Sequence, residues 1–312
     1  MYRSKHKFVF ICLVGLLLTV STSAKPLTTT DDSDFIGDPS DSCDWEGSGL
    51  TAGDDRVVVP IYLRCLQGTV KWLYPTSALQ VTLNYGNSQS QANSDFRGCI
   101  KIAANSSAKV RLYVEGVYQS LHKVYAHDDG KHPELIRCFA SNHGRVALYI
   151  EADKKSAGVM KEYFQFSYHL EPVNSIRALY NADDDECRPC TDYEMHTTYC
   201  TSDFVIRGSV TSLYNNEALQ RTELSINAHN IVKDIVPMQS DSSSKSLSNR
   251  NTTIVLHRPL KCHAKAGRGS EFFFLGHWVL GNPVIKCAPK VSYWKHVKSR
   301  AIETAANQCQ LD

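Results

Sequence analysis

Four residues in the second half of the chain have the spacing of a thiol–disulfide active site. Cys187-Arg188-Pro189-Cys190 is a Cys-x-x-Cys sequence, and in oxidoreductases the first cysteine of such a pair is a thiolate whose pKa is lowered, usually by a helix N-terminus. The residues that follow lack the βαβ pattern of that fold, and Cys200 lies close by. Two structural half-cystines are therefore the better interpretation, with redox catalysis as the weaker alternative.

The chain offers little support for a metal site. No second Cys-x-x-Cys or His pair has the spacing of a zinc finger, and a thiolate site would need the cysteines to stay reduced. The densest group of other metal ligands consists of His127, Asp128, Asp129, His132 and Glu134. Asp129-Gly130 is also an ordinary turn, so a cation there stays an open alternative and we assign no metal ligand.

Sequence motifs of other enzyme classes are missing. The chain contains no His-Glu-x-x-His, Gly-x-Ser-x-Gly, phosphate-binding loop or Gly-x-Gly-x-x-Gly sequence. We therefore predict a protein that is not an enzyme, with no catalytic residue and no cofactor.

The first 24 residues predict a secretory signal peptide. Arg3, Lys5 and Lys7 precede an apolar segment, and small residues follow it up to Ala24. The apolar segment is too short to span a membrane and no similar one follows. We expect a secreted, extracellular protein whose mature chain does not insert into a membrane. Without the three cations of this segment the formal charge changes from +2 to −1, so a nucleic-acid partner is not expected.

Cysteine usage supports secretion independently. Eleven cysteines become ten when Cys12 is removed with the signal peptide, and an even number suits disulfides in an oxidising compartment. Four of them, Cys43, Cys65, Cys99 and Cys138, allow three pairings, of which the local one closes two short loops. The other six allow fifteen; they are Cys187, Cys190, Cys200, Cys262, Cys287 and Cys309. Two sequons, at Asn105 and Asn251, predict N-glycosylation.

The first half of the mature chain predicts an antiparallel β-sandwich. Residues 25–42 are polar and are expected to form a flexible arm, whereas residues 43–172 contain several short segments of alternating apolar residues, such as Leu79, Val81 and Leu83. Pro60 places its segment at a sheet edge, and Glu115-Gly116 marks a turn. An acidic linker, residues 173–186, separates this domain from residues 187–312.

The second half predicts a small barrel with a helix against it. Residues 204–210 favour a strand, with a bulge at Arg207-Gly208, and residues 271–280 are typical of a buried strand. Trp294, Val297 and Ala301 recur at helical spacing, which predicts an amphipathic helix from about residue 293 to 308. A basic group near this end could bind a heparin-like glycan if its members share one face; it consists of Lys286, Lys290, Lys295, His296, Lys298 and Arg300.

Several segments together resemble the meteorin family. They are CDWEGSGL from Cys43, IYLRC ending at Cys65, WLYPTSALQVTL from Trp72, CRPC, CTSDFVIRGSV from Cys200, GHWVLG from Gly276 and KCAPK from Lys286. The resemblance implies a mainly β chain: an N-terminal CUB-type sandwich and a netrin-like barrel of the OB type with a flanking C-terminal helix. It also implies the pairs Cys43 with Cys65, Cys99 with Cys138, Cys187 with Cys262, Cys190 with Cys287 and Cys200 with Cys309.

The resemblance further implies a secreted signalling factor that acts through a cell-surface receptor, in glial differentiation and axon growth or in metabolic and immune signalling. The netrin-like fold also suggests an alternative, an extracellular protease inhibitor or a matrix- or heparin-binding protein. Inhibitors of metalloproteinases with this fold chelate zinc through the amine and carbonyl of an N-terminal cysteine. Cys187 follows a whole domain, so its amine is in a peptide bond and this chemistry is not expected.

Overall fold

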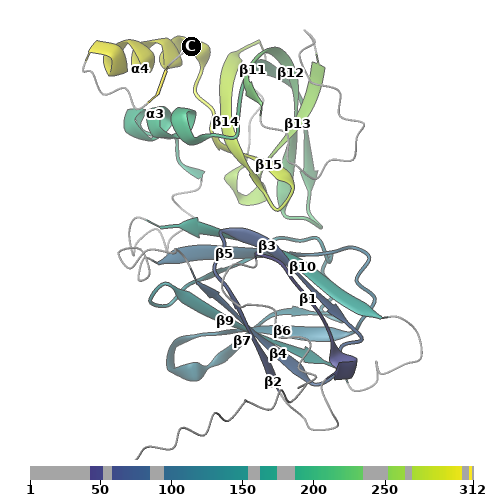
Figure 1. The fold of residues 1–312 in the computed structure, drawn as a ribbon. Coiled ribbons are helices and arrows are strands. Elements are labelled where there is room, and N and C mark those ends of the chain that lie inside the picture. Colours follow the sequence, from purple (N-terminus) through teal and green to yellow (C-terminus); the bar gives the residue numbers. More distant parts are fainter. Residues whose placement is uncertain are drawn as a thin grey trace, which may run out of the picture. The chain divides into compact units, whose positions relative to one another are not determined.

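The structure is a computed structural model that describes residues 43–51, 58–84, 95–153, 162–173, 187–234, 252–263, 269–303 and 309–310. Within these residues the chain is mainly β, with two five-stranded sheets in its N-terminal part and a closed five-stranded barrel in its C-terminal part (Figure 1). The predicted signal peptide, the arm, residues 174–186 of the linker and Asn251 lie outside the described residues. The predicted domain boundaries stay predictions.

The two N-terminal sheets form a sandwich. The first has the strand order β1-β3-β10-β5-β8 and the second the order β2-β4-β9-β6-β7. The strands of the first are β1 Trp45–Ser48, β3 Gln67–Leu73, β10 Tyr163–Pro172, β5 Phe96–Ile102 and β8 Arg137–Ala140. Those of the second are β2 Val58–Leu63, β4 Ala78–Asn84, β9 Arg145–Ala152, β6 Val110–Glu115 and β7 Leu121–Ala126. Two short 3-10 turns, η1 Gly49–Thr51 and η2 Val117–Gln119, belong to the same part.

The sandwich is not antiparallel throughout. β1 pairs with β3, and β2 with β4, in parallel, while the other described pairs in both sheets are antiparallel. From β1 to β4 the chain alternates between the two sheets. In each of these two pairs the neighbouring strands are therefore two apart in sequence and run in the same direction. β2, which contains Pro60, lies at a sheet edge as predicted.

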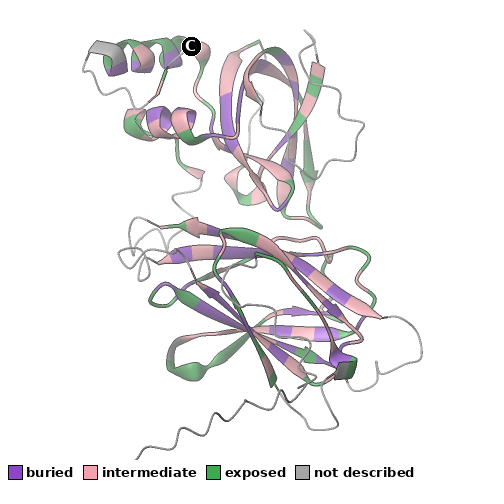
Figure 2. Ribbon diagram, viewed as in Figure 1, coloured by how far each residue is buried: buried purple, intermediate pink, exposed green. Residues whose placement is uncertain are grey.

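Alternating apolar residues form the core of the sandwich (Figure 2). In β10 every second residue from Phe164 to Leu170 is buried, and in β4 Leu79, Val81 and Leu83 are buried. This is the period-two pattern that places one face of each strand against the other sheet. The Tyr168 hydroxyl donates a hydrogen bond to the carbonyl of Cys43 at 2.8 Å, so the core also anchors the first described residue.

The C-terminal barrel closes in the order β11-β12-β13-β15-β14. Its strands are β11 Phe204–Asn216, β12 Arg221–Asp234, β13 Thr252–Pro259, β15 Asn282–Cys287 and β14 Glu271–Val279, and the 3-10 turn η4 Leu260–Cys262 follows β13. The register between β11 and β12 shifts between Arg207 and Gly208, which confirms the predicted bulge. Such shifts bend a strand and let a short sheet close on itself. Phe204, Ile226 and Phe274 fill the interior.

Two described helices pack on the outside of this barrel (Figure 1). α4 Val291–Glu303 is the predicted amphipathic helix, with Trp294, Val297 and Ala301 buried; residues 304–308 of the prediction lie outside the described residues. α3 Asp192–Thr201 begins two residues after Cys190 and contains Cys200 near its end; no helix was predicted there. Met195 and Tyr199 of α3 join Trp294 and Val297 in a second small core against the barrel.

Candidate functional site

The Cys-x-x-Cys sequence is divided between two disulfides. Cys187 pairs with Cys262 in η4, and Cys190 pairs with Cys287 at the end of β15. The third disulfide of this part joins Cys200, at the end of α3, to Cys309. The sandwich contains Cys43–Cys65 and Cys99–Cys138. All ten cysteines of the described chain are therefore half-cystines, and none supplies the thiolate that redox catalysis would need.

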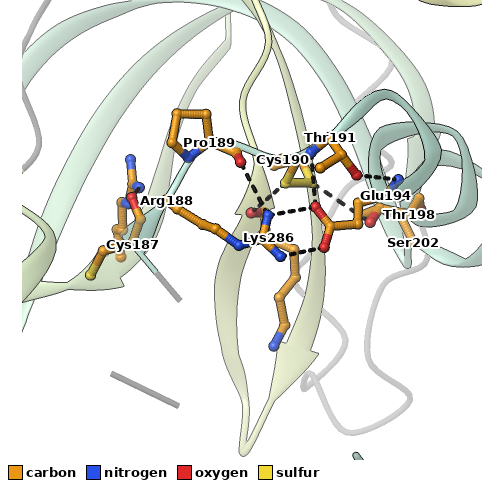
Figure 3. The surroundings of a disulfide bond; sticks show 11 residues. Cys187, Arg188, Pro189, Cys190, Thr191, Glu194, Thr198, Ser202 and Lys286 are labelled. Atoms are coloured by element: carbon orange, nitrogen blue, oxygen red, sulfur yellow. Dashed lines mark hydrogen bonds and ion pairs between the residues drawn. A yellow bond between two sulfur atoms is a disulfide. The ribbon is translucent and has the colours of Figure 1, made fainter. Parts of the chain in front are cut away.

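Cys190 leads directly into the N-terminus of α3, and a capping box begins that helix (Figure 3). The Thr191 hydroxyl accepts a hydrogen bond from the Glu194 backbone N–H at 3.3 Å, and the Glu194 carboxylate accepts one from the Thr191 N–H at 2.8 Å. These reciprocal bonds satisfy backbone donors that have no partner inside the helix. Thr-x-x-Glu at residues 191–194 is the sequence signal that could have predicted α3.

Arg188 adds a charge to this cap. Its guanidinium donates to both oxygens of Glu194, at 2.8 and 2.5 Å. These hydrogen bonds are the main reason that the pKa of Glu194 is lowered to about 2. Both middle residues of the Cys-x-x-Cys sequence therefore belong to one hydrogen-bonded group: Arg188 donates to Glu194 of α3 and also to the Pro189 carbonyl, at 3.3 Å.

A pocket of about 390 Å³ lies beside the two disulfides. Its apolar lining includes Met195, Ile285 and Pro289, and its basic side chains are Arg188, Arg258 and Lys286. Arg258 donates a hydrogen bond to the Cys187 carbonyl at 3.1 Å. The polar side chains of the lining also include His263 and Tyr293. The pocket therefore combines apolar and basic groups.

The contact between α3 and α4 fixes the outer side of this region. Tyr199 and Trp294 stack with their ring centroids 4.9 Å apart. Asp192 accepts a hydrogen bond from the Tyr293 hydroxyl at 2.7 Å and forms an ion pair with Arg300. Aromatic stacking and disulfides together hold the two helices against the barrel.

The six basic residues proposed to bind glycan do not form one continuous face. Lys295 and Lys298, three residues apart, share one flank of α4, whereas His296 and Arg300, four apart, share another. Arg300 is paired with Asp192. Lys290 is exposed just before α4, and Lys286 is half-buried in β15. Part of the predicted positive charge is therefore already neutralised within the protein.

Asp129, in the possible cation site between residues 127 and 134, has partners within the protein. The Asp129 carboxylate lies 3.4 Å from the buried Arg137 guanidinium, and it accepts a backbone hydrogen bond from Lys131 at 2.9 Å. The Arg137 guanidinium also lies over the Tyr125 ring, 5.0 Å from its centroid. No group of three or more His, Cys, Asp or Glu side chains in the described part of the chain is arranged to hold a metal ion.

Of the two predicted glycosylation sites, Asn105 lies in an exposed turn that precedes β6. The Ser107 hydroxyl, at the third position of this sequon, accepts a hydrogen bond from the Tyr163 backbone N–H at 3.1 Å. Asn251 lies outside the described residues. Among the residues that the structure describes, no helix is both long enough and apolar enough to cross a membrane.

Comparison with known proteins identifies a family for both parts of the chain. The family of the Meteorin-like protein N-terminal domain matches residues 45–179, and that of the Meteorin C-terminal domain matches residues 189–301. The chain belongs to the meteorin family. The first family match spans every described strand of the sandwich, and the second spans Cys190, the barrel and most of α4.

Relatives in this family match nearly the whole chain. Meteorin-like protein of Xenopus laevis is 32% identical over 87% of this chain and 91% of its own length. Meteorin-like protein of Mus musculus is 31% identical over 88% of this chain and 84% of its own length. Meteorin of Rattus norvegicus is 29% identical over 87% of this chain and 90% of its own length. A solved structure of the CUB1-EGF-CUB2 domains of rat MASP-1 is 14% identical, covering 42% of this chain and 48% of its own, with a TM-score of 0.27. That likeness is too low to support an assignment, so the sandwich rests on its own strands.

Proposed function

We propose that this member of the meteorin family is a secreted, non-enzymatic signalling factor that acts through a cell-surface receptor. Five disulfides that use all ten cysteines of the described chain carry the proposal, because such a framework forms and persists in the secretory pathway. The proposed processing removes residues 1–24 and places glycans on Asn105 and Asn251. The processes that we propose are glial differentiation and axon growth, or metabolic and immune signalling.

The physical argument for a receptor ligand is pre-organisation. A surface loop loses conformational entropy when it binds a partner, and a scaffold that already holds the loop reduces that loss. In the sandwich, the Cys99–Cys138 disulfide joins facing residues of β5 and β8. In the barrel, the disulfides at Cys187, Cys190 and Cys200 hold segments far apart in sequence, with separations of 75, 97 and 109 residues. Both scaffolds are rigid supports for surface loops.

The alternative of metalloproteinase inhibition through Cys187 finds no support in this geometry. Its sulfur is bonded to Cys262, and its carbonyl accepts a hydrogen bond from Arg258. A zinc-chelating cysteine would need a free amine and an accessible carbonyl.

Binding of heparin-like glycans remains a weaker second proposal, supported by exposed Lys290, Lys295 and His296. Elution from heparin at low salt would fit it, because few unpaired cations contribute.

The experiment that tests the main proposal measures binding of the secreted, fluorescently labelled full-length protein to intact cells. The panel includes glial, neuronal, adipose and immune cells. We expect saturable binding to at least one cell type, competition by the unlabelled protein, and loss of binding after trypsin treatment of the cells. Absence of saturable binding across the panel, or tight inhibition of a metalloproteinase by the same preparation, would contradict the proposal.

A further inference from the structure

The hairpin between β6 and β7 combines an exposed aromatic side chain with an unfavourable backbone. Tyr118 is 98% exposed, and it has a positive φ of 60°. Gln119, the next residue, has a φ of 59°. Residues with a Cβ rarely adopt this left-handed conformation, and hairpin turns that require it usually contain Gly, Asn or Asp. The fold gains no burial from Tyr118 in return for this cost.

Contacts below the tip hold the hairpin in this conformation. The Gly116 backbone N–H donates to the Ser120 carbonyl at 2.8 Å, which closes the loop. The His122 ring lies against Gly116, where a Cβ would come within 2.7 Å of it, and its Nε2 lies 3.1 Å from the Ser120 hydroxyl. These contacts therefore hold the two tip residues in an unfavourable backbone conformation. Backbone strain of this kind is concentrated at functional sites in proteins.

Side chains beside the tip extend the surface. Leu121 is 52% exposed, and Lys123, two residues further along β7, is also exposed. Residues two apart in a strand point to the same face, so these two flank each other. Within the described residues, no carboxylate pairs with Lys123 or with His122. The hairpin thus presents a rigid aromatic ring, an aliphatic side chain and an unneutralised cation.

We propose that this hairpin, residues 116–123, is a receptor-binding site, with Tyr118 as its anchor. The inference rests on the proposed function and specifies its contact surface. The chemistry that fits is a receptor ectodomain with an apolar pocket for the Tyr118 ring, a hydrogen-bond acceptor within it for the hydroxyl, and a carboxylate at the rim for Lys123. Tyrosine is enriched at binding hot spots because a large ring with few rotatable bonds loses little entropy on burial.

The decisive variant is Tyr118→Gly, because it separates a binding role from a structural one. Glycine adopts a positive φ without cost, so we expect a higher unfolding temperature than in the wild type together with a loss of cell binding of about tenfold or more. Gln119→Gly is the matched control: it relieves the same backbone strain one residue away, and binding should stay within about twofold of the wild type. Lys123→Glu should weaken binding and reverse part of its salt dependence.

The readout is binding of labelled full-length variants to a cell type that binds the wild type saturably. Wild-type affinity in Tyr118→Gly would overturn the inference while leaving the proposed function intact. Unchanged binding by Lys123→Glu would exclude a receptor carboxylate opposite Lys123 at the rim of the pocket. Equal losses in Tyr118→Gly and Gln119→Gly would show that loop conformation, not the ring, matters, and would also overturn it. Binding that survives trypsin and is reproduced on phosphatidylserine-containing vesicles would place the hairpin on lipid instead. If the wild type binds no cell type, the proposed function itself fails.

Discussion

The sandwich, with two five-stranded sheets, and the barrel, with a single closed sheet of five strands, are stabilised in different ways. Among the described residues, the sandwich has one continuous core of 22 buried residues, and its disulfides join cysteines 22 and 39 positions apart. The barrel has two smaller cores, of eight and seven buried residues, and its disulfides span 75 to 109 positions. A small core contributes less hydrophobic stabilisation, whereas a long disulfide loop restricts the unfolded chain more. The comparison teaches that the barrel depends on covalent links where the sandwich depends on packing.

The largest effect should follow from removing the longest link. Replacing both Cys200 and Cys309 by Ser should lower the free energy of unfolding of the barrel by about 5 kcal/mol, against about 3 kcal/mol for the sandwich when Cys43 and Cys65 are replaced. Calorimetry of the secreted proteins would separate the two transitions, and the amounts secreted would rank them independently. Equal destabilisation of the two parts would contradict the comparison.

Loss of the aromatic contact between α3 and α4 should come next. Trp294 is 2% exposed and stacks on Tyr199, so Trp294→Ala should cost about 3 to 5 kcal/mol. Only the barrel transition should move in a calorimetric scan. Phe166→Ala, in the sandwich core, is the matched control and should move only the sandwich transition. A shift of both transitions by either variant would show that the two parts unfold together.

A smaller effect is expected at the start of α3. Thr191→Ala removes the hydroxyl that accepts from the Glu194 backbone N–H and should cost about 1 kcal/mol in urea unfolding of the barrel. Thr191→Ser keeps an acceptor at the same position and should cost less. If Ser and Ala are equally destabilising, the cap does not contribute as described.

The smallest effect depends on pH. The pKa of Glu194 is about 2 in the folded protein, below its ordinary value of 4.5. The folded state therefore favours the ionised carboxylate, and ionisation of Glu194 contributes to the free energy of unfolding. This contribution is fully present above pH 4.5 and is lost as the pH falls toward 2. Because the Glu194 side chain is 37% exposed, solvent screening limits it to about 1 kcal/mol or less.

Glu194→Gln keeps an acceptor for the Thr191 N–H but removes the charge. The difference in stability between wild type and variant should therefore shrink as the pH is lowered from 5 toward 2, as measured by urea unfolding at each pH. A difference that stays constant across this range would contradict the Arg188–Glu194 account.

Local sequence patterns predicted those strands and helices whose buried residues recur at a regular spacing. Alternation identified β4 because one face of the strand is buried, and helical spacing identified α4 through Trp294, Val297 and Ala301. α3 was missed because it is only ten residues long and its buried residues include the polar His196; its signal was the Thr191–Glu194 capping box.

Other features depend on contacts between distant residues and could not be predicted locally. The parallel pairs β1–β3 and β2–β4 follow from the alternation of the chain between two sheets. Arg188 was noticed only as part of a Cys-x-x-Cys sequence, and its pairing with Glu194 appears only when the helix places that carboxylate beside it. The left-handed Tyr118 and Gln119 carry no turn signal, since neither residue type favours a positive φ.

Mass spectrometry of the secreted, unreduced protein after alkylation of free thiols tests the central claim, a covalent framework that uses every mature cysteine. The account predicts no alkylated cysteine and five disulfide-linked peptide pairs, with Cys187 joined to Cys262 and Cys190 joined to Cys287. An alkylated Cys187 or Cys190, or a direct bond between them, would contradict the account and restore the dithiol interpretation.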